Sequence, residues 1–327
     1  EVLARISHLY PEIDLPRKYG GGKSQVIAWI WVRTVNSPNP AFSHVQVPLA
    51  SSFVLSNKEG KEAYVHPVVS GDSYTFDVRE GKPPAEAKQG TKLSKGANFR
   101  CLVSNTPIEP KYIYAEANAG RLGVKLMAVV AEGSRRRIYL PPTTEMEDVA
   151  KLAKPEWRPE IAMPENPRWF SPPLYGLKNY ADIFTDRQLV ALTTYSDCVA
   201  NVRERVRVDA TKAGFKDDGV SLEDGGRGAT AYADAIAMYL AFAIDRCADF
   251  SNTCTRWVPG NQKVMNLFGK QAVGMTWDFP EANITAETVG GFLPALNYVA
   301  DCLEMLPVNP ADGFAQQITN NLRNLKH

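Results

Sequence analysis

Long apolar runs, histidines and paired cysteines are scarce in this sequence of 327 residues, and each shortage excludes a class of protein. No apolar run reaches the roughly 18 residues of a membrane-spanning helix, so no membrane partner is expected. The four histidines include no H-E-x-x-H pair, which leaves a zinc hydrolase without support. The five cysteines are widely spaced and form no C-x-x-C pair, which predicts free, mostly buried thiols in a reducing, cytoplasmic compartment.

A marked excess of charge of either sign is also lacking, because 37 Lys and Arg face 36 Asp and Glu, for a net charge of +1. This balance excludes a strongly basic nucleic-acid coat protein but permits a local basic patch. The first eight residues contain no apolar segment, so a secretion signal is not expected. Because the chain begins at Glu1 rather than at a methionine, we interpret it as a fragment of a longer protein.

The first part of the chain, residues 1–142, has the short apolar stretches and the Gly, Pro and Asn punctuation that are typical of β-structure. The β-branched and aromatic run at 25–35 is the clearest strand. The polar segment 82–96, rich in Pro, Gly and Lys, is expected to be a mobile loop. Further strands are expected at 45–47, 52–55, 63–69, 74–78, 111–115, 126–130 and 137–140.

The second part, residues 143–327, is predicted to be mainly helical after a proline-rich linker. Thr185 and Gln188 form a capping box, after which apolar residues recur at helical spacing up to Gly214. Two further helices are expected at about 229–250 and 290–306. We therefore predict an α+β fold in which a β-rich domain, 1–142, precedes a helical domain, 143–327.

Arginines gather at three places that can contact DNA phosphates. Three lie on a predicted turn, two share one face of the helix that follows Thr185, and one lies in a glycine-rich turn before the next helix. The alternative is an ordinary solvated surface, because Glu204 and Asp209 offset the charge of the helical pair. The candidate DNA contacts are Arg135, Arg136, Arg137, Arg203, Arg207 and Arg227.

The segment 277–283 combines two aromatic residues, two carboxylates and an asparagine beside a proline. Loops of this composition often line a binding site, whereas the alternative is an irregular loop anchored by its aromatic residues. The candidate pocket-lining residues are Trp277, Asp278, Phe279 and Asn283. No complete catalytic constellation is recognisable in the sequence, so no catalytic residue is assigned.

Several stretches together resemble one family, the zinc-ribbon-containing adenine-specific DNA methylases of bacteria and archaea. The similar segments follow one another in the family's order and cover nearly the whole chain. They are residues 26–40, 126–140, 175–194, 218–229 and 266–283. Residues 316–327 are similar to the run-up to the family's D-P-P-Y motif.

The resemblance implies a middle region of a larger enzyme, inserted between two motifs that this sequence lacks. The family carries a glycine-rich S-adenosylmethionine loop upstream and the D-P-P-Y motif downstream. We therefore expect S-adenosylmethionine to bind the full-length parent, with no cofactor held by this chain. Its expected partners are DNA and the rest of the methyltransferase. Its expected role is DNA contact and scaffold rather than catalysis, and its position is one where some amino-methyltransferases carry target recognition. The alternative is a structural or protein-interaction module.

The family pattern C-P-N-P-x-C followed by C-x-x-C supplies four thiolates for a structural zinc ion. The corresponding positions in this sequence are Ser37, Phe42, Cys101 and Ser104, so only one thiolate remains. Because a hydroxyl is a poor zinc ligand and Phe is none, we expect a degenerate ribbon without metal. Phe42 is then expected to fill the space of a ligand.

Overall fold

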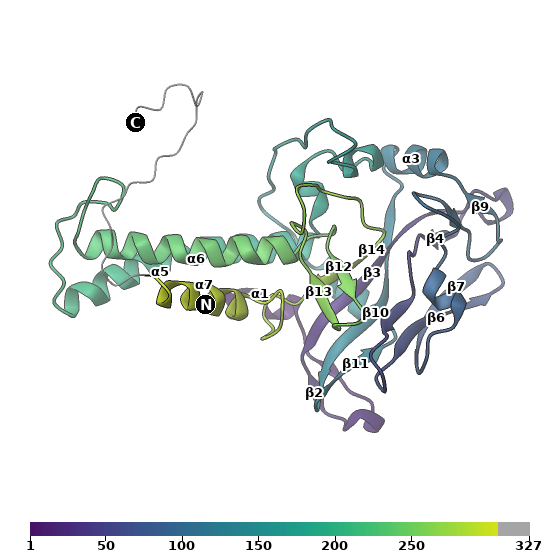
Figure 1. Cartoon of the computed structure of the whole chain (residues 1–327), viewed down its shortest axis with the longest axis horizontal. Helices are drawn as coiled ribbons and strands as arrows, with labels where there is room; N and C mark the ends of the chain where they lie inside the picture. Colours follow the sequence, from purple (N-terminus) through teal and green to yellow (C-terminus); the bar gives the residue numbers. More distant parts are fainter. Residues whose placement is uncertain (307–327) are drawn as a thin grey trace.

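The computed structural model describes residues 1–306 and has the predicted α+β architecture, with a β-rich body and a long helical arm (Figure 1). Residues 307–327, which include the segment compared with the run-up to D-P-P-Y, lie outside the described residues. None of the helices within residues 1–306 has the length and apolar character needed to cross a membrane.

A five-stranded antiparallel sheet forms the centre of the body. Its strands run in the order β11 (Arg136–Leu140), β10 (Gly123–Gly133), β3 (Val26–Asn36) and β14 (Asp278–Ala282), and β4 (Gln46–Pro48) pairs with the end of β3. Strand β3 is buried along almost its whole length, because both faces of the sheet are covered. Its β-branched and aromatic residues suit that position.

Smaller antiparallel units cover one face of the central sheet and extend its rim. One is the three-stranded sheet of β5 (Val54–Ser56), β6 (Ala63–Ser70) and β7 (Ser73–Glu80). Three short hairpins complete the body: β1 (Ile13–Asp14) with β2 (Lys23–Ser24), β8 (Phe99–Arg100) with β9 (Pro107–Ile108), and β12 (Arg256–Val258) with β13 (Lys263–Met265).

Helices cover the other face of the sheet and form the arm. The antiparallel pair α5 (Asp186–Lys212) and α6 (Ala229–Phe250) projects from the body, with α7 (Phe292–Glu304) alongside (Figure 1). The predicted capping box at Thr185 and Gln188 is present, and Gly214 has φ +94° just beyond the end of α5. The remaining α-helices are α1 (Val2–Ile6), α2 (Ala85–Gln89), α3 (Pro110–Asn118) and α4 (Thr144–Lys151). Short 3-10 helices are η1 (Ser7–Leu9), η2 (Arg17–Tyr19), η3 (Pro40–Phe42), η4 (Pro172–Tyr175) and η5 (Tyr180–Ile183).

Two local predictions within residues 1–142 are wrong. Residues 111–115, expected as a strand, belong to helix α3, where Pro110 occupies the first turn and Ile113 and Ala117 are buried at helical spacing. The expected loop at 82–96 contains α2 and is anchored to the core, because the Thr91 hydroxyl donates to the Pro48 carbonyl at 2.9 Å. The composition rich in Pro, Gly and Lys therefore does not correspond to a mobile loop in this segment.

The segment expected as a loop at 277–283 is mostly strand β14. Pro280 is compatible with this, because β14 lies at the edge of the sheet, where a residue without an N–H is tolerated. Since β14 pairs with β3, the central sheet takes a strand from beyond residue 142. The β-rich part of the molecule is therefore discontinuous in sequence.

Candidate functional site

Two rows of side chains share the helix-covered face of the central sheet. Because side chains alternate along a strand, Trp29, Trp31 and Arg33 of β3 point to the same face. The register of β14 places Phe279 opposite Trp31 and Glu281 opposite Trp29. This face therefore has aromatic and charged residues side by side, beneath the start of α5.

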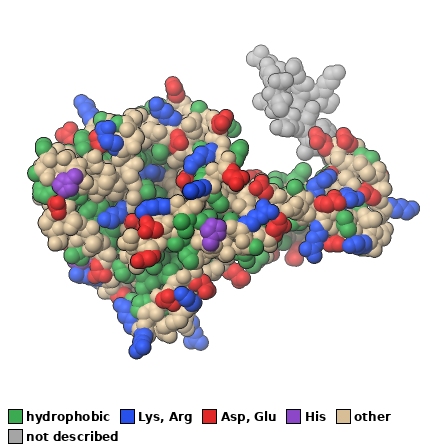
Figure 2. Space-filling view, turned by 180° about the vertical axis from the view of Figure 1, so that it is seen from behind, with side chains coloured by type: hydrophobic (Ala, Val, Ile, Leu, Met, Phe, Trp, Pro, Cys, Tyr) green, Lys and Arg blue, Asp and Glu red, His purple; other side chains and the backbone are tan. Residues whose placement is uncertain are grey.

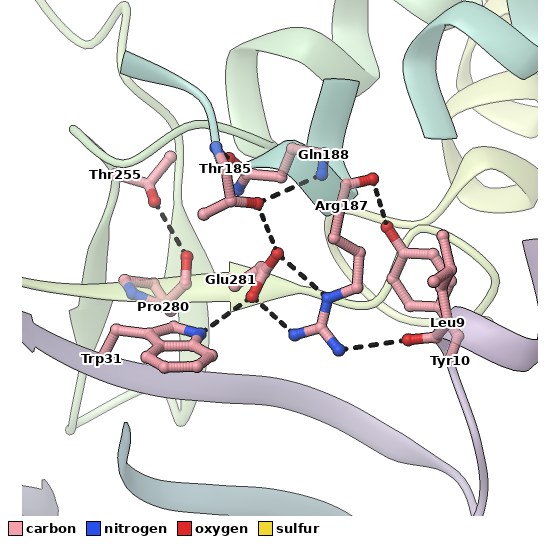
Figure 3. Close-up of polar contacts among 9 residues, drawn as sticks. All are labelled: Leu9, Tyr10, Trp31, Thr185, Arg187, Gln188, Thr255, Pro280 and Glu281. Carbon is pink, nitrogen blue, oxygen red and sulfur yellow. Dashed lines mark hydrogen bonds and ion pairs between the residues drawn. The ribbon is translucent and has the colours of Figure 1, made fainter. Parts of the chain in front are cut away.

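A buried ion pair joins β14 to α5 at this face (Figure 3). The side chains of Arg187 and Glu281 are each only 1% exposed, and their Nη2 and Oε2 atoms are 2.5 Å apart. Glu281 also accepts from Trp31 Nε1 at 2.8 Å and from the Thr185 hydroxyl at 2.6 Å. The carboxylate is thus held by donors from β3 and from the start of α5.

The guanidinium of Arg187 also has contacts beyond the ion pair. Its Nη1 donates to the Leu9 carbonyl at 3.1 Å, and its plane lies 3.9 Å from the Trp29 ring centre. Burial by itself would raise the pKa of the Glu281 carboxyl, but the Arg187 charge and the hydrogen bonds outweigh burial, so the pKa is lowered. We interpret this pair as a positioning element that fixes α5 on the sheet, because every polar atom is engaged.

A cavity of about 340 Å³ opens beside this ion pair. Its lining includes Trp31, Arg33 and Phe279, together with residues of α4. Arg33 is 4% exposed, and its Nε and Nη2 donate to the Thr276 carbonyl and the Thr253 hydroxyl at 2.8 and 2.9 Å. Burial lowers the pKa of Arg33.

A second cavity, of about 440 Å³, lies by the other end of β14. It is lined by Trp277 and Asp278 together with the cations Lys92 and Arg256. Asp278 accepts from the Ser51 backbone N–H at 2.8 Å, and burial raises the pKa of its carboxyl. An acid, two cations and an aromatic ring therefore line the same cavity.

The structure separates the four residues predicted to line one pocket. Trp277 and Asp278 line the second cavity, whereas Phe279 lines the first. Asn283 lines neither of them: it is 1% exposed and donates to the Val26 carbonyl at 2.7 Å, which fixes the end of β14. Strand alternation, which a loop would not impose, explains this division.

A still larger cavity, of about 880 Å³, lies along the N-terminal half of α5. The charged residues on its wall lie at the protein surface, and one of them, Arg5, pairs with Glu1 at 2.6 Å. No buried polar group among its lining residues points to a ligand.

The predicted DNA contacts fall into two groups that do not form one surface. Arg135, Arg136 and Arg137 lie at the hairpin between β10 and β11, where the Arg136 Nη2 is 3.2 Å from the Glu80 carboxylate. The other three arginines belong to the arm, and two of them form ion pairs. These contacts are Arg203 with Asp234, and Arg207 with Glu204 and Asp217, while Arg227 lies in the connection before α6.

Figure 2, which views the molecule from behind relative to Figure 1, shows basic (blue) and acidic (red) side chains interspersed over both the arm and the body. The hairpin arginines are the less compensated group, because within residues 1–306 Arg135 and Arg137 take part in no ion pair. Arg135 has a left-handed backbone, with φ +61°, at the tip of the turn. The solvated-surface interpretation thus fits the arm arginines better than those of the hairpin.

Three of the four positions that correspond to zinc ligands in the resembling family lie together. The Ser37 hydroxyl is 3.3 Å from the Cys101 sulfur, and the Ser104 backbone N–H donates to the same sulfur at 3.3 Å. Phe42 packs against the core cluster that contains Cys101. Burial would raise the pKa of the Cys101 thiol, but hydrogen bonds from Ser104 and Ser37 outweigh it and lower the pKa. One thiol, two hydroxyls and a phenyl ring do not fit a structural zinc ion.

The Arg187–Glu281 pair and Arg33 were not among the predicted site residues. One sequence feature could have identified them: each is a charged residue within a segment whose other residues predict a buried strand or the buried start of a helix. Comparisons of the chain with protein-family models, curated proteins and solved structures found no match.

Proposed function

We propose that this chain is the middle region of a zinc-ribbon-type adenine-specific DNA methyltransferase, and that it contributes DNA contact and scaffold rather than catalysis. The observation that carries the proposal is the meeting of Ser37, Cys101 and Ser104, three positions that the family's zinc pattern brings together in space. Ser37 lies 64 and 67 positions before Cys101 and Ser104 in sequence, so its contact with them is not a consequence of local chain geometry and supports the proposal. The proposal assigns no methyl-transfer step to residues of this chain, because the cofactor loop and the D-P-P-Y motif are not in its sequence.

The surface proposed to contact DNA is the hairpin of Arg135, Arg136 and Arg137. It projects at a turn, and two of its three guanidinium groups form no ion pair with any other residue of the described chain. The arm arginines form a weaker candidate surface, because Arg203 and Arg207 are neutralised by carboxylates. A contact with phosphates there would first have to break those pairs.

The test is binding of the full chain to a fluorescently labelled DNA duplex at several salt concentrations. Changing Arg135, Arg136 and Arg137 together to alanine is expected to weaken binding and to lower the slope of log K against log salt by about 2 to 3, one phosphate each. A matched control changes the exposed Lys82, Lys88 and Lys95 to alanine, which removes equal charge elsewhere. Equal losses for both variants, or no salt-dependent binding at all, contradict the DNA-contact role.

A second candidate function, a protein-interaction module, is favoured by apolar side chains on the arm. Met238 and Phe242 of α6 and Tyr298 of α7 are each about half exposed. An apolar surface of this kind is typical of contact with another protein. In the methyltransferase proposal, the partner is the rest of the same enzyme.

The two candidate functions are distinguished by variants that act on one surface each. The changes Met238→Asp and Phe242→Asp are expected to prevent assembly with the remainder of the methyltransferase while salt-dependent DNA binding persists. The alanine variant of the hairpin is expected to lose salt-dependent DNA binding and to assemble normally. If the hairpin variant assembles normally and wild-type chain shows no DNA binding, the interaction-module function replaces the first.

A further inference from the structure

Arg33 is a buried cation without a carboxylate partner. Its side chain forms no ion pair with any residue in the described part of the chain. Two of its nitrogens, Nε and Nη2, donate to the neutral groups of Thr276 and Thr253. Because arginine keeps its charge in proteins, the cost of burying this charge is only partly offset by those carbonyl and hydroxyl oxygens.

The third nitrogen of Arg33 is the one that remains available. Nη1 has no hydrogen-bond partner within residues 1–306, and it is not among the sealed, unpartnered polar atoms of the interior. Arg33 lines the 340 Å³ cavity, so this donor group is accessible from the cavity. A guanidinium with a free N–H at the floor of a cavity is a suitable partner for an anion.

The other cations of the cavity are already neutralised. Arg187 pairs with Glu281, and Lys151 pairs with Asp148 at 2.8 Å. The aromatic side chains of Trp31 and Phe279 supply apolar wall, and the volume is in the range of small-molecule sites. Among the described cations that line the cavity, Arg33 is therefore the one without an ion-pair partner, and it lies beside apolar surface.

DNA does not fit this site. A backbone phosphate cannot approach a guanidinium that is 96% buried unless the rest of the duplex enters the cavity as well. The wall also carries the carboxylates of Glu147, Asp182 and Asp186, which repel a polyanion. A compact molecule with a single anionic group can enter the cavity, and these carboxylates repel it less than they repel a polyanion.

We propose that this cavity binds a small organic anion, with its carboxylate or phosphate group on Arg33 and its apolar body against Trp31 and Phe279. The site is separate from the proposed DNA contact at the hairpin of Arg135, Arg136 and Arg137 and does not depend on it. Carboxylate and phosphate share the recognition chemistry of a guanidinium, so the experiment compares the two.

Calorimetric titration of the full chain with benzoate, phenyl phosphate and the neutral analogue benzamide tests this proposal. At least one of the two anions is expected to bind with one-to-one stoichiometry and at least tenfold more tightly than benzamide. The preferred anion identifies the head group. If benzamide binds as tightly as both anions, or if none of the three binds, the proposal is wrong.

Variants at the mouth of the cavity locate the site without disturbing the buried arginine. Val124 lines the cavity and is 52% exposed, so Val124→Trp is expected to obstruct entry and to weaken anion binding at least tenfold. The matched control is Val68→Trp on β6, where the valine is 42% exposed and lines none of the cavities described above. Equal affinity for Val124→Trp and Val68→Trp overturns the assignment.

A charge-removing variant completes the test. Arg33→Gln is expected to abolish the preference for the anion over benzamide. If this variant does not fold, the comparison of Val124→Trp with Val68→Trp decides the outcome. If it folds and still prefers the anion, the anion does not bind at Arg33 and the proposal fails.

Discussion

Asp278 and Glu281 lie three residues apart on strand β14, yet their carboxyl pKa values are shifted in opposite directions. The Glu281 carboxylate has a buried cation and two further donors, Trp31 and Thr185, whereas Asp278 has a single backbone donor at Ser51. Alternation along the strand places the two groups on opposite faces of the sheet. Glu281 therefore stabilises the fold as a charged group, whereas Asp278 is the more readily protonated of the two.

Loss of the Glu281 charge should strongly destabilise the protein. Glu281→Gln leaves the Arg187 guanidinium buried without a counter-ion, which is expected to lower the free energy of unfolding by about 3 to 5 kcal/mol. Urea denaturation followed by circular dichroism measures this difference. The exposed pair of Lys151 and Asp148 provides the control, since Asp148→Asn should cost less than about 1 kcal/mol. Similar small losses for both variants would contradict the structural role of the buried pair.

The effect of Glu281→Gln should depend on pH in a defined direction. The folded-state pKa of Glu281 lies below its ordinary value of 4.5, so its stabilisation is present above pH 4.5 and is lost as pH falls through the folded-state pKa. The difference in unfolding free energy between wild type and variant is therefore expected to shrink on acidification. Denaturation series from pH 7 to pH 3 measure it, and a constant difference over that range is the contrary outcome.

Asp278→Asn should behave in the opposite way. The folded-state pKa of Asp278 is raised above 3.8, so ionisation at neutral pH disfavours the folded state, and protonation relieves this cost as pH falls. Asparagine keeps an acceptor for the Ser51 N–H and removes the charge. We expect the variant to be at least as stable as wild type at pH 7, with the advantage disappearing at acid pH. A loss above about 1 kcal/mol at pH 7 would show that the charged form is needed structurally.

The degenerate ribbon makes a prediction about metal. Wild-type protein purified in the presence of zinc is expected to contain far less than one zinc ion per chain by elemental analysis, because Cys101 is the sole thiol of the four positions. The triple change Ser37→Cys, Phe42→Cys and Ser104→Cys restores four thiolates and is expected to bind one zinc ion. The double change Ser37→Cys and Ser104→Cys, which supplies only three thiolates, is the control. Stoichiometric zinc in wild type, or none in the triple variant, contradicts the assignment.

Local signals in the sequence predicted most of the longer elements of the fold, but not the short hairpins or the helices α1 to α4. The capping box at Thr185 predicted where α5 begins, and the strand at 25–35 was evident from its β-branched and aromatic residues. The prediction failed at 111–115, because five residues are too few to distinguish strand alternation from helical spacing. Strand β14 was missed because its partner, β3, is about 250 positions away.

The candidate site was less predictable for the same reason. Arg187 and Glu281 are 94 residues apart, and nothing local to either residue reveals the other. The free donor on Arg33 likewise follows from what Thr253 and Thr276 leave unsatisfied. Motif-based interpretation identified Asp278 and Phe279 as pocket residues, yet it placed them in one pocket because it treated their segment as a loop.

The pairing of β3 with β14 also affects how the molecule is made. During synthesis, β3 emerges about 250 residues before the strand that pairs with its outer edge, so that edge stays unpaired until β14 has been made. Such a distant pairing closes a long loop and is expected to form late in folding. Because Glu281 lies on β14, its ion pair with Arg187 needs this strand in place, and we therefore expect it to join the arm to the body late in folding.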